Sequence, residues 1–454
     1  MGVAAVTAGQ APQQARPPVF GTIGSAGRSA GPTRVATAVP GATARDTVGS
    51  AIPERVIMAE ARDTCVRARF PDFWFEVGSQ EYALDAPQSV TSEACAEILR
   101  AADDATRVFA AVVPIIAALP RYELHAIGIP ARAVNACRTL GGSVPTVLGR
   151  FDFAMTADGP KVLEFNADTP FFMWETFEIA GALVRARGLC DPNVGALDVL
   201  RAAIVRVCAT LRPQERLAVC AYNTWREDWF SAKFLARVAS EALGREVDCV
   251  PLHELRVDEL GCYDARGTRI DVLWRLYPLE HLAHDPAAGV FFDRLADGLV
   301  RTINPPHALL AQTKAALAIA WGLRDSDVLD SATRGRIKRL FLPTYLDLPD
   351  DGTRYVRKPV LGREGRGVAI VDAQSVLESA RSAKHPVAYE RQPVVYQQYA
   401  ELQRVHISLP GIPAHFDRAI VTCFVADGTP CGIGMRVGGA VTDASAVMVP
   451  LAVR

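Results

Sequence analysis

Polar and hydrophobic residues alternate along two neighbouring stretches, residues 149–156 and 160–166. Such alternation is typical of half-buried β-strands, because successive side chains of a strand point to opposite faces. The sequence Ala-Asp-Gly-Pro at 157–160 joins the two stretches and has the residue types of a tight turn. The pattern therefore predicts a β-hairpin centred on Asp158.

The predicted hairpin gathers polar groups on one face. Antiparallel pairing about its centre places Arg150 opposite Asn166 and Asp152 opposite Glu164. The other face then carries the apolar residues Phe151, Phe153, Leu163 and Phe165. Two carboxylates and an amide oxygen suit a hard cation such as Mg2+, and a neighbouring arginine suits a phosphate. Spacing alone favours an ordinary hairpin with a solvated polar face and cross-strand charge pairs.

Helical periodicity is found before and after the hairpin. Residues 92–110 carry a helical pattern with Ser92 as a candidate N-cap, and Pro114 is expected to break or kink the apolar run that follows. Another helix is predicted over 174–187, with Gly188 as its stop. No chemistry is predicted in the region before the hairpin, which we interpret as scaffold.

Strand and helix patterns alternate in the middle of the chain. After a helix at 195–211, strands are predicted at 216–222, 246–252 and 269–275, with a helix at 229–243 after the first of them. This order predicts a parallel sheet, because parallel strands need a crossover connection that is usually a helix.

An acidic pair, Glu227 and Asp228, lies at the first strand-to-helix junction of this region. Acids in the first turn of a helix are favoured by its dipole, so ordinary capping explains the pair without any ligand. Substrate binding is the alternative interpretation.

A glycine-rich segment at 354–371 has two β-rich arms around Gly362, Gly365 and Gly367. Such a loop can turn backbone N–H groups towards phosphate oxygens, and Lys358 on the first arm can neutralise their charge. It lacks the G-x-x-x-x-G-K-[ST] pattern of a P-loop. Taken alone, the loop is a weak signal that often marks only a hairpin.

Composition narrows the class of protein. The 454 residues have a net charge of −1, which gives no electrostatic reason to expect nucleic acid or an anionic membrane as a partner. The ten cysteines are scattered without C-x-x-C pairs, as expected of small core residues in a reducing compartment. No apolar run reaches membrane-spanning length. A cytoplasmic protein is expected.

Residues 1–50 differ from the remainder, because Ala, Gly, Pro, Thr and Val dominate and no acidic residue precedes Asp46. This composition predicts a disordered tail. An organelle transit peptide is the alternative, although no amphipathic helical period is visible.

Several of these segments resemble the glutathionylspermidine synthase family, a branch of the ATP-grasp carboxylate–amine ligases. The family pattern R-x-D, a short turn and L-E-[YF]-N-A-D-[TS] is matched here from Arg150 to Thr169. The segments at 269–280, 358–368 and 394–399 are similar to its I-D-x-[LV]-[FW]-[KR]-x-Y-P-x-E segment, phosphate-covering loop and adenine hinge. The resemblance runs from about Phe70 to the C-terminus.

The resemblance implies an α/β (α+β) ATP-grasp fold with a pre-ATP-grasp-like α/β domain. The metal strand precedes the phosphate lysine, as in the circularly permuted branch of the fold. The implied organisation comprises the tail at 1–50, a helical scaffold with the metal-ligand hairpin at 51–215, an α/β substrate domain at 216–305 and nucleotide-binding subdomains with a Gly-rich lid at 306–454.

The resemblance also implies roles for single residues. Two Mg2+ ions would be held by Asp152, Glu164 and Asn166. ATP would be contacted by Arg150, Lys314, Lys358, Gly362, Arg363, Gly365, Gly367, Gln397, Gln398 and Tyr399. Arg150 and Arg436 would stabilise the transferred phosphate, and Thr169, Glu227 and Asp228 would contact substrate. Thr313 replaces the usual Asn before Lys314, and Glu401-Leu402 replaces a Leu-Pro step after the hinge.

The implied activity is ATP-dependent amide formation between small-molecule substrates through an acyl phosphate. Family members place small hydroxyl residues after the metal motif, where a thiol-containing peptide is held, but this chain has Phe-Phe-Met-Trp at 171–174. We therefore expect an acid other than glutathione, and a polyamine or basic amine as nucleophile. An ATP-dependent phosphotransferase and a non-catalytic nucleotide-binding protein are the alternatives, and the oligomeric state is undetermined.

Overall fold

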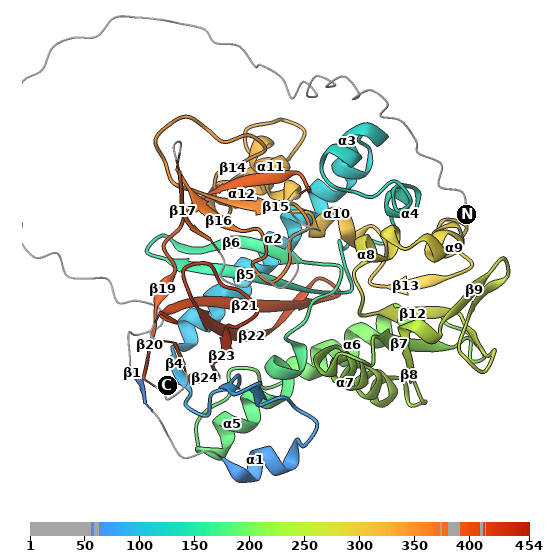
Figure 1. Cartoon of the computed structure of the whole chain (residues 1–454), viewed down its shortest axis with the longest axis horizontal. Helices are drawn as coiled ribbons and strands as arrows, with labels where there is room; N and C mark the ends of the chain where they lie inside the picture. The colour runs from blue at the N-terminus through green and yellow to red at the C-terminus, as the bar shows by residue number, and fades with distance from the viewer. Residues whose placement is uncertain (1–55, 59–62, 373–374, 380–390, 409–411, 414) are drawn as a thin grey trace, which may run out of the picture. The chain divides into compact units, whose positions relative to one another are not determined.

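A computed structural model describes residues 56–58, 63–372, 375–379, 391–408, 412–413 and 415–454 (Figure 1). The predicted tail at 1–50 lies outside the described residues. Residues 49–454 form one compact unit whose largest sheets have six, five and four strands. Among the described residues, no helix combines the length and hydrophobicity needed to span a membrane.

The predicted hairpin forms part of the six-stranded antiparallel sheet. Arg150 pairs with Asn166 and Asp152 with Glu164, as predicted. A bulge after Asp152 shifts the register, so Val162 enters the core and Leu163 is only half-buried, contrary to the prediction for Leu163. The strands are β5 (Leu148–Thr156), β6 (Gly159–Asn166), β19 (Gln403–Arg404), β21 (Arg418–Ala426), β22 (Thr429–Gly438) and β23 (Val447–Met448).

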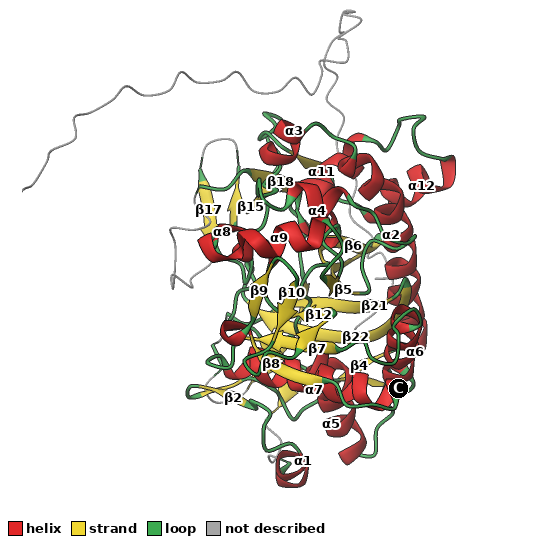
Figure 2. Cartoon of the chain, turned by 90° about the vertical axis from the view of Figure 1, so that its right-hand side faces the viewer, coloured by secondary structure: helices red, strands yellow, loops and turns green. Residues whose placement is uncertain are grey.

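Helix α2 (Ser92–Ala117) packs along this sheet (Figure 2). Its Phe109 ring lies 4.9 Å from the Phe165 ring, which in turn stacks on Phe151 at 3.9 Å. The helix is capped by the Thr91 side chain and not by Ser92. Pro114 does not end it, because α2 continues to Ala117. This apolar layer fixes the hairpin, so its polar face is held in place from behind.

The four-stranded sheet has the order β13-β12-β7-β8 with every pair parallel, which confirms the predicted parallel sheet. Helix α7 begins at Arg226, earlier than predicted, so Glu227 and Asp228 lie in its first turn. The elements of this layer are α6 (Ala196–Cys208), β7 (Leu217–Ala221), α7 (Arg226–Leu243), β8 (Asp248–Pro251), β12 (Val272–Arg275) and β13 (Arg301–Ile303).

The five-stranded antiparallel sheet lies beside β6 (Figure 1), where its Gln397 side chain donates to the Val162 carbonyl. The glycine-rich loop joins β15 to β16. At Gly365 the backbone has a φ of +70° and a Cβ would lie 2.5 Å from the Thr442 carbonyl oxygen, so glycine is required. The strands are β14 (Thr344–Tyr345), β15 (Tyr355–Pro359), β16 (Ala369–Val371), β17 (Val376–Ser379) and β18 (Val394–Gln398).

The helix predicted at 174–187 is a π-helical turn η1 (Glu175–Ile179) followed by α5 (Ala180–Ala186), and Gly188 follows it with a φ of +68°. Phe172, Met173 and Trp174 are buried in the core. Phe171 is half-buried, and the effect of these four residues on a substrate pocket stays a prediction.

The remaining elements are shorter. The helices are α1 (Thr64–Arg69), α3 (Arg121–Ala126), α4 (Val134–Arg138), η2 (Leu252–Glu254), α8 (Leu279–His284), η3 (Pro286–Ala288), α9 (Gly289–Ala296), α10 (Ala308–Gln312), α11 (Ala315–Gly322) and α12 (Ser331–Leu340). The strands are β1 (Val56–Met58), β2 (Glu76–Val77), β3 (Gln80–Glu81), β4 (Gln88–Val90), β9 (Arg256–Asp258), β10 (Gly261–Tyr263), β11 (Arg269–Ile270), β20 (His406–Ser408) and β24 (Leu451–Val453).

Candidate functional site

A buried ion pair lies on the polar face of β5. The Arg150 guanidinium donates two hydrogen bonds to the Asp152 carboxylate, at 2.7 and 2.9 Å, and its Nη1 donates to the Phe171 carbonyl at 2.6 Å. Both side chains are more than nine-tenths buried. Burial raises the pKa of Asp152, the neighbouring charge of Glu164 raises it further, and Arg150 opposes both effects.

Glu164, opposite Asp152 on β6, is held by an amide and a lysine. Asn166 Nδ2 donates to Oε1 at 3.1 Å, and Lys314 Nζ lies 3.1 Å from Oε2. Burial alone would raise the pKa of Glu164, but the charges of Lys314 and Lys358 hold it well below its usual range.

These residues fit a magnesium site by chemistry. Asp152 and Glu164 are paired residues on adjacent strands, and Asn166 contacts Glu164, so three oxygen-bearing side chains are gathered. The described residues include no group of three or more His, Cys, Asp or Glu side chains placed for a metal. The candidate set has only two carboxylates, as is usual where phosphate oxygens complete the coordination of Mg2+.

Lys314 and Lys358 approach this face from two different elements. Lys314, at the N-cap of α11, donates to the Gly362 carbonyl at 2.7 Å. Lys358 on β15 donates to the Leu163 carbonyl at 3.0 Å and to the Gln397 side chain at 2.6 Å. Burial lowers the pKa of Lys358 to about 8. Together with Arg150 they surround the carboxylate pair with positive charge.

The glycine-rich loop is attached to the end of β6 by Arg363. Its Nη1 donates to the Thr169 hydroxyl at 2.8 Å, and its Nε donates to Glu280 Oε1 at 2.9 Å. Asp168, next to Thr169, forms a fully buried ion pair with Arg275 of β12. This network therefore joins the segment after the hairpin to both the parallel sheet and the glycine-rich loop.

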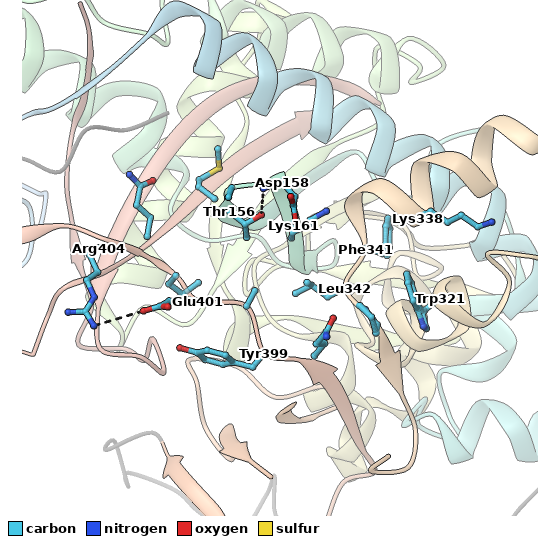
Figure 3. A pocket seen from close by; sticks show the side chains of 17 residues that line it. Thr156, Asp158, Lys161, Trp321, Lys338, Phe341, Leu342, Tyr399, Glu401 and Arg404 are labelled. Atoms are coloured by element: carbon cyan, nitrogen blue, oxygen red, sulfur yellow. Dashed lines mark hydrogen bonds and ion pairs between the residues drawn. The ribbon is translucent and has the colours of Figure 1, made fainter. Parts of the chain in front are cut away.

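A cavity of about 730 Å³ lies beside the predicted adenine hinge (Figure 3). Tyr399 lies across it from Thr156 and Asp158 of the hairpin turn. The backbone N–H groups of Gln398 and Tyr399 already donate to the Pro343 and Arg354 carbonyls. These two N–H groups are therefore not available to hydrogen-bond the edge of a base. Residues 400–402 follow them along the cavity wall, so their backbone is the alternative contact for a base.

Arg436 and the acidic pair complete the predicted set. Arg436 on β22 donates to the Asp443 carbonyl at 3.2 Å, and its charge acts on Asp152. Asp228 is half-buried, and burial with the charges of Glu227 and Glu364 raises its pKa to about 7. Glu364 belongs to the glycine-rich loop, so the acidic pair of α7 faces that loop.

The sequence profile of the glutathionylspermidine synthase preATP-grasp family matches residues 69–454. The chain belongs to this family. A protein of Haemophilus influenzae named as a presumed acid–amine ligase is 28% identical over 308 residues, which are 64% of this chain and 70% of that protein.

Solved structures are also similar. A glutathione synthetase-like effector from Globodera pallida, in its apo form, gives a TM-score of 0.49 at 11% identity and covers 81% of this chain and 89% of its own. A presumed γ-glutamylcysteine synthetase from Methylobacillus flagellatus gives a TM-score of 0.40 at 12% identity. The match covers 67% of this chain and 78% of that chain.

Sequence reasoning missed residues that position this family site. Asp168 lies in the metal motif, but its buried partner Arg275 was not foreseen. Asn304 lies outside the predicted motifs, yet its side chain binds the backbone of Leu148 and Ala167 at the entry and exit of the hairpin. The family-like segment at 269–280 contains Arg275 and Glu280, so it was a signal that could have identified these two residues.

Proposed function

We propose that this chain is an ATP-dependent carboxylate–amine ligase that forms an amide through an acyl phosphate on an ATP-grasp scaffold. One observation carries the proposal: Asp152 and Glu164 lie side by side and are surrounded by Arg150, Lys314 and Lys358. A cation-and-carboxylate arrangement of this kind suits Mg2+ and polyphosphate. The name of the Haemophilus influenzae relative supports the acid–amine class.

Mg2+ held by Asp152, Glu164 and Asn166 would neutralise charge on the ATP phosphates. Arg150 and Lys314 would then exchange their present carboxylate partners for phosphate oxygens, since both already lie against the ligand set. Lys358 would contribute positive charge from β15, the strand that precedes the glycine-rich loop. None of these side chains needs to act as a nucleophile, because positioning and charge stabilisation suffice for phosphoryl transfer.

The nucleotide base is assigned to the cavity beside the hinge. Its wall combines backbone at 400–402 with the apolar side chains of Met155, Leu342 and Leu402. Backbone groups read base edges while apolar side chains sandwich a planar ring. Gln397 is assigned a supporting role and no direct contact with the nucleotide. Its side chain binds the Lys358 ammonium group and the Val162 carbonyl.

The acid and the amine are assigned to the region between Thr169 and α7. Half-buried Phe171 follows the metal motif, where the resemblance implies a hydroxyl residue in contact with a peptide, and this favours an acid other than glutathione. The carboxylates of Glu227, Asp228 and Glu364 favour a cationic amine.

The test combines purified protein, ATP and Mg2+ with pooled carboxylic acids and amines, including spermidine with and without glutathione. ADP release identifies active pools, and mass spectrometry identifies the conjugate. An amide product with stoichiometric ADP is expected. ADP with a phosphorylated product would establish a phosphotransferase, and no ADP from any pool would overturn the proposal.

A further inference from the structure

A tyrosine and a glutamate form a buried pair outside the residues discussed so far. The Tyr82 hydroxyl donates to Glu175 Oε1 at 2.7 Å. Glu175 is only 3% exposed, and its Oε2 has no hydrogen-bond partner within the described part of the chain. A buried carboxylate oxygen without a partner is costly, so this arrangement calls for an explanation.

The backbone fixes Tyr82 beside the predicted phosphate-facing arginine. Met448 of β23 pairs with Arg436 of β22 and, on its other side, its N–H donates to the Tyr82 carbonyl at 2.7 Å. The backbone at Met448 therefore lies between the backbone at Tyr82 and the backbone at Arg436. The Tyr82 side chain is half-buried.

Glu175 is influenced by charges of both the proposed phosphate site and the acidic pair of α7. It is the first residue of η1, and the charges of Arg150 and Glu227 both act on it. Arg150 belongs to the phosphate side and Glu227 to the acidic pair of α7. Isolated π-helical turns inside helices are frequent at functional sites.

We propose that Tyr82, backed by Glu175, binds the ammonium group of a cationic amine substrate and selects it over neutral amines. This inference rests on the proposed ligase function and adds the Tyr82–Glu175 pair to the acidic residues proposed to receive the amine, since the charge of Glu227 acts on both members of the pair. The Tyr82 proton is donated to Glu175, so the hydroxyl oxygen presents its lone pairs to an N–H donor. The carboxylate behind it strengthens that bond.

The pKa of Glu175 would respond to a cation bound beside it. Burial raises its pKa to about 7 and Glu227 adds to the effect, while the Tyr82 hydrogen bond and Arg150 oppose it. An ammonium ion bound at Tyr82 would favour the ionised carboxylate, because an opposite charge lowers a carboxyl pKa. Amine binding and ionisation of Glu175 therefore support each other.

The test measures binding directly, with spermidine as the probe and the full chain loaded with a non-hydrolysable ATP analogue and Mg2+. Tyr82→Phe and Glu175→Gln are compared with Tyr122→Phe and Glu123→Gln, because Tyr122 donates to Glu123 in a similar but exposed pair. Calorimetry gives the spermidine and ATP-analogue affinities of each variant.

Loss of a charge-assisted hydrogen bond should weaken spermidine binding at least about tenfold in Tyr82→Phe and Glu175→Gln. The affinity for the ATP analogue should stay the same, and neither control should change. Spermidine binding unchanged in Tyr82→Phe, a parallel loss of analogue binding, or no spermidine binding by the wild type would overturn the inference.

A separate reaction distinguishes failure of the ligase proposal from failure of the amine-site inference. Neutral hydroxylamine traps an acyl phosphate as a hydroxamate without needing the ammonium site. A wild-type protein that binds spermidine through Tyr82 yet forms neither ADP nor hydroxamate with any acid would contradict the ligase function and leave the amine site standing.

Discussion

Lys314 and Glu164 meet at 3.1 Å between Nζ and Oε2, although one begins a helix and the other lies on a distant strand. Lys314 is 4% exposed, and its second bond holds the Gly362 carbonyl of the glycine-rich loop. One lysine therefore joins the proposed metal ligands to the proposed lid. A ligand that takes Glu164 would free Lys314 for phosphate.

Glu164→Gln should abolish activity without unfolding the protein. The amide keeps one oxygen that can accept from Lys314 or Asn166, but it loses the charge that a hard cation needs. We expect ADP formation to fall by about 100-fold or more, which corresponds to about 3 kcal/mol of lost stabilisation. Exposed Glu254→Gln is the control. Ordinary turnover by Glu164→Gln at normal Mg2+ would remove Glu164 from the ligand set.

Lys358→Met should weaken binding of an ATP analogue by roughly 2 to 3 kcal/mol, because a charge-assisted contact is lost. The wild-type affinity should be constant below pH 7 and fall above pH 8, since the lowered pKa of about 8 lets Lys358 lose its proton there. The variant should lack this pH dependence. Exposed Lys233→Met serves as control. A wild-type affinity that does not change from pH 7 to 9.5 would contradict this role.

The loop at 361–368 should become more protected when nucleotide binds. Arg363 currently anchors it to Thr169 and Glu280, and phosphate would add contacts to its glycine backbone. Hydrogen exchange of the loop should slow with an ATP analogue and Mg2+. Glu280→Gln should speed exchange in the free protein, because it loses a charged partner of Arg363. Equal exchange with and without nucleotide would argue against a phosphate lid.

Asp168→Ala should lower the free energy of unfolding by about 3 to 5 kcal/mol, because Arg275 would be left buried without its partner. Both side chains are 0% exposed. The exposed Arg107 and Asp103 pair is the matched control, and Asp103→Ala should cost less than about 1 kcal/mol. Urea unfolding measures both.

The same pair predicts a pH dependence of stability. Burial alone would raise the pKa of Asp168, but Arg275 lowers it below the ordinary value. The stabilisation is therefore complete above the unfolded carboxyl pKa of about 4 and is lost as the pH falls through the lower folded pKa. The gap between wild type and Asp168→Ala should shrink in acid. A gap that widens in acid would contradict this assignment.

Elements with local causes could be predicted from the order of residues alone. Alternation and a turn predicted the β5–β6 hairpin with the pairing of Arg150 to Asn166 and Asp152 to Glu164. Strand and helix order predicted the parallel sheet. The motifs were sufficient for family membership, since each of them is a short run of neighbouring residues that can be recognised without the structure.

Contacts between residues that are distant in the chain became visible only in the folded protein. Phe172, Met173 and Trp174 belong to a core cluster with residues far along the chain, and a local pattern of apolar residues cannot reveal those partners. Tyr82 reaches Glu175 because β23 brings its segment beside Arg436. Buried charges such as Asp168 find partners far along the chain, because burial without a partner costs more than the chain can offset. Local periodicity carries no information about such pairs.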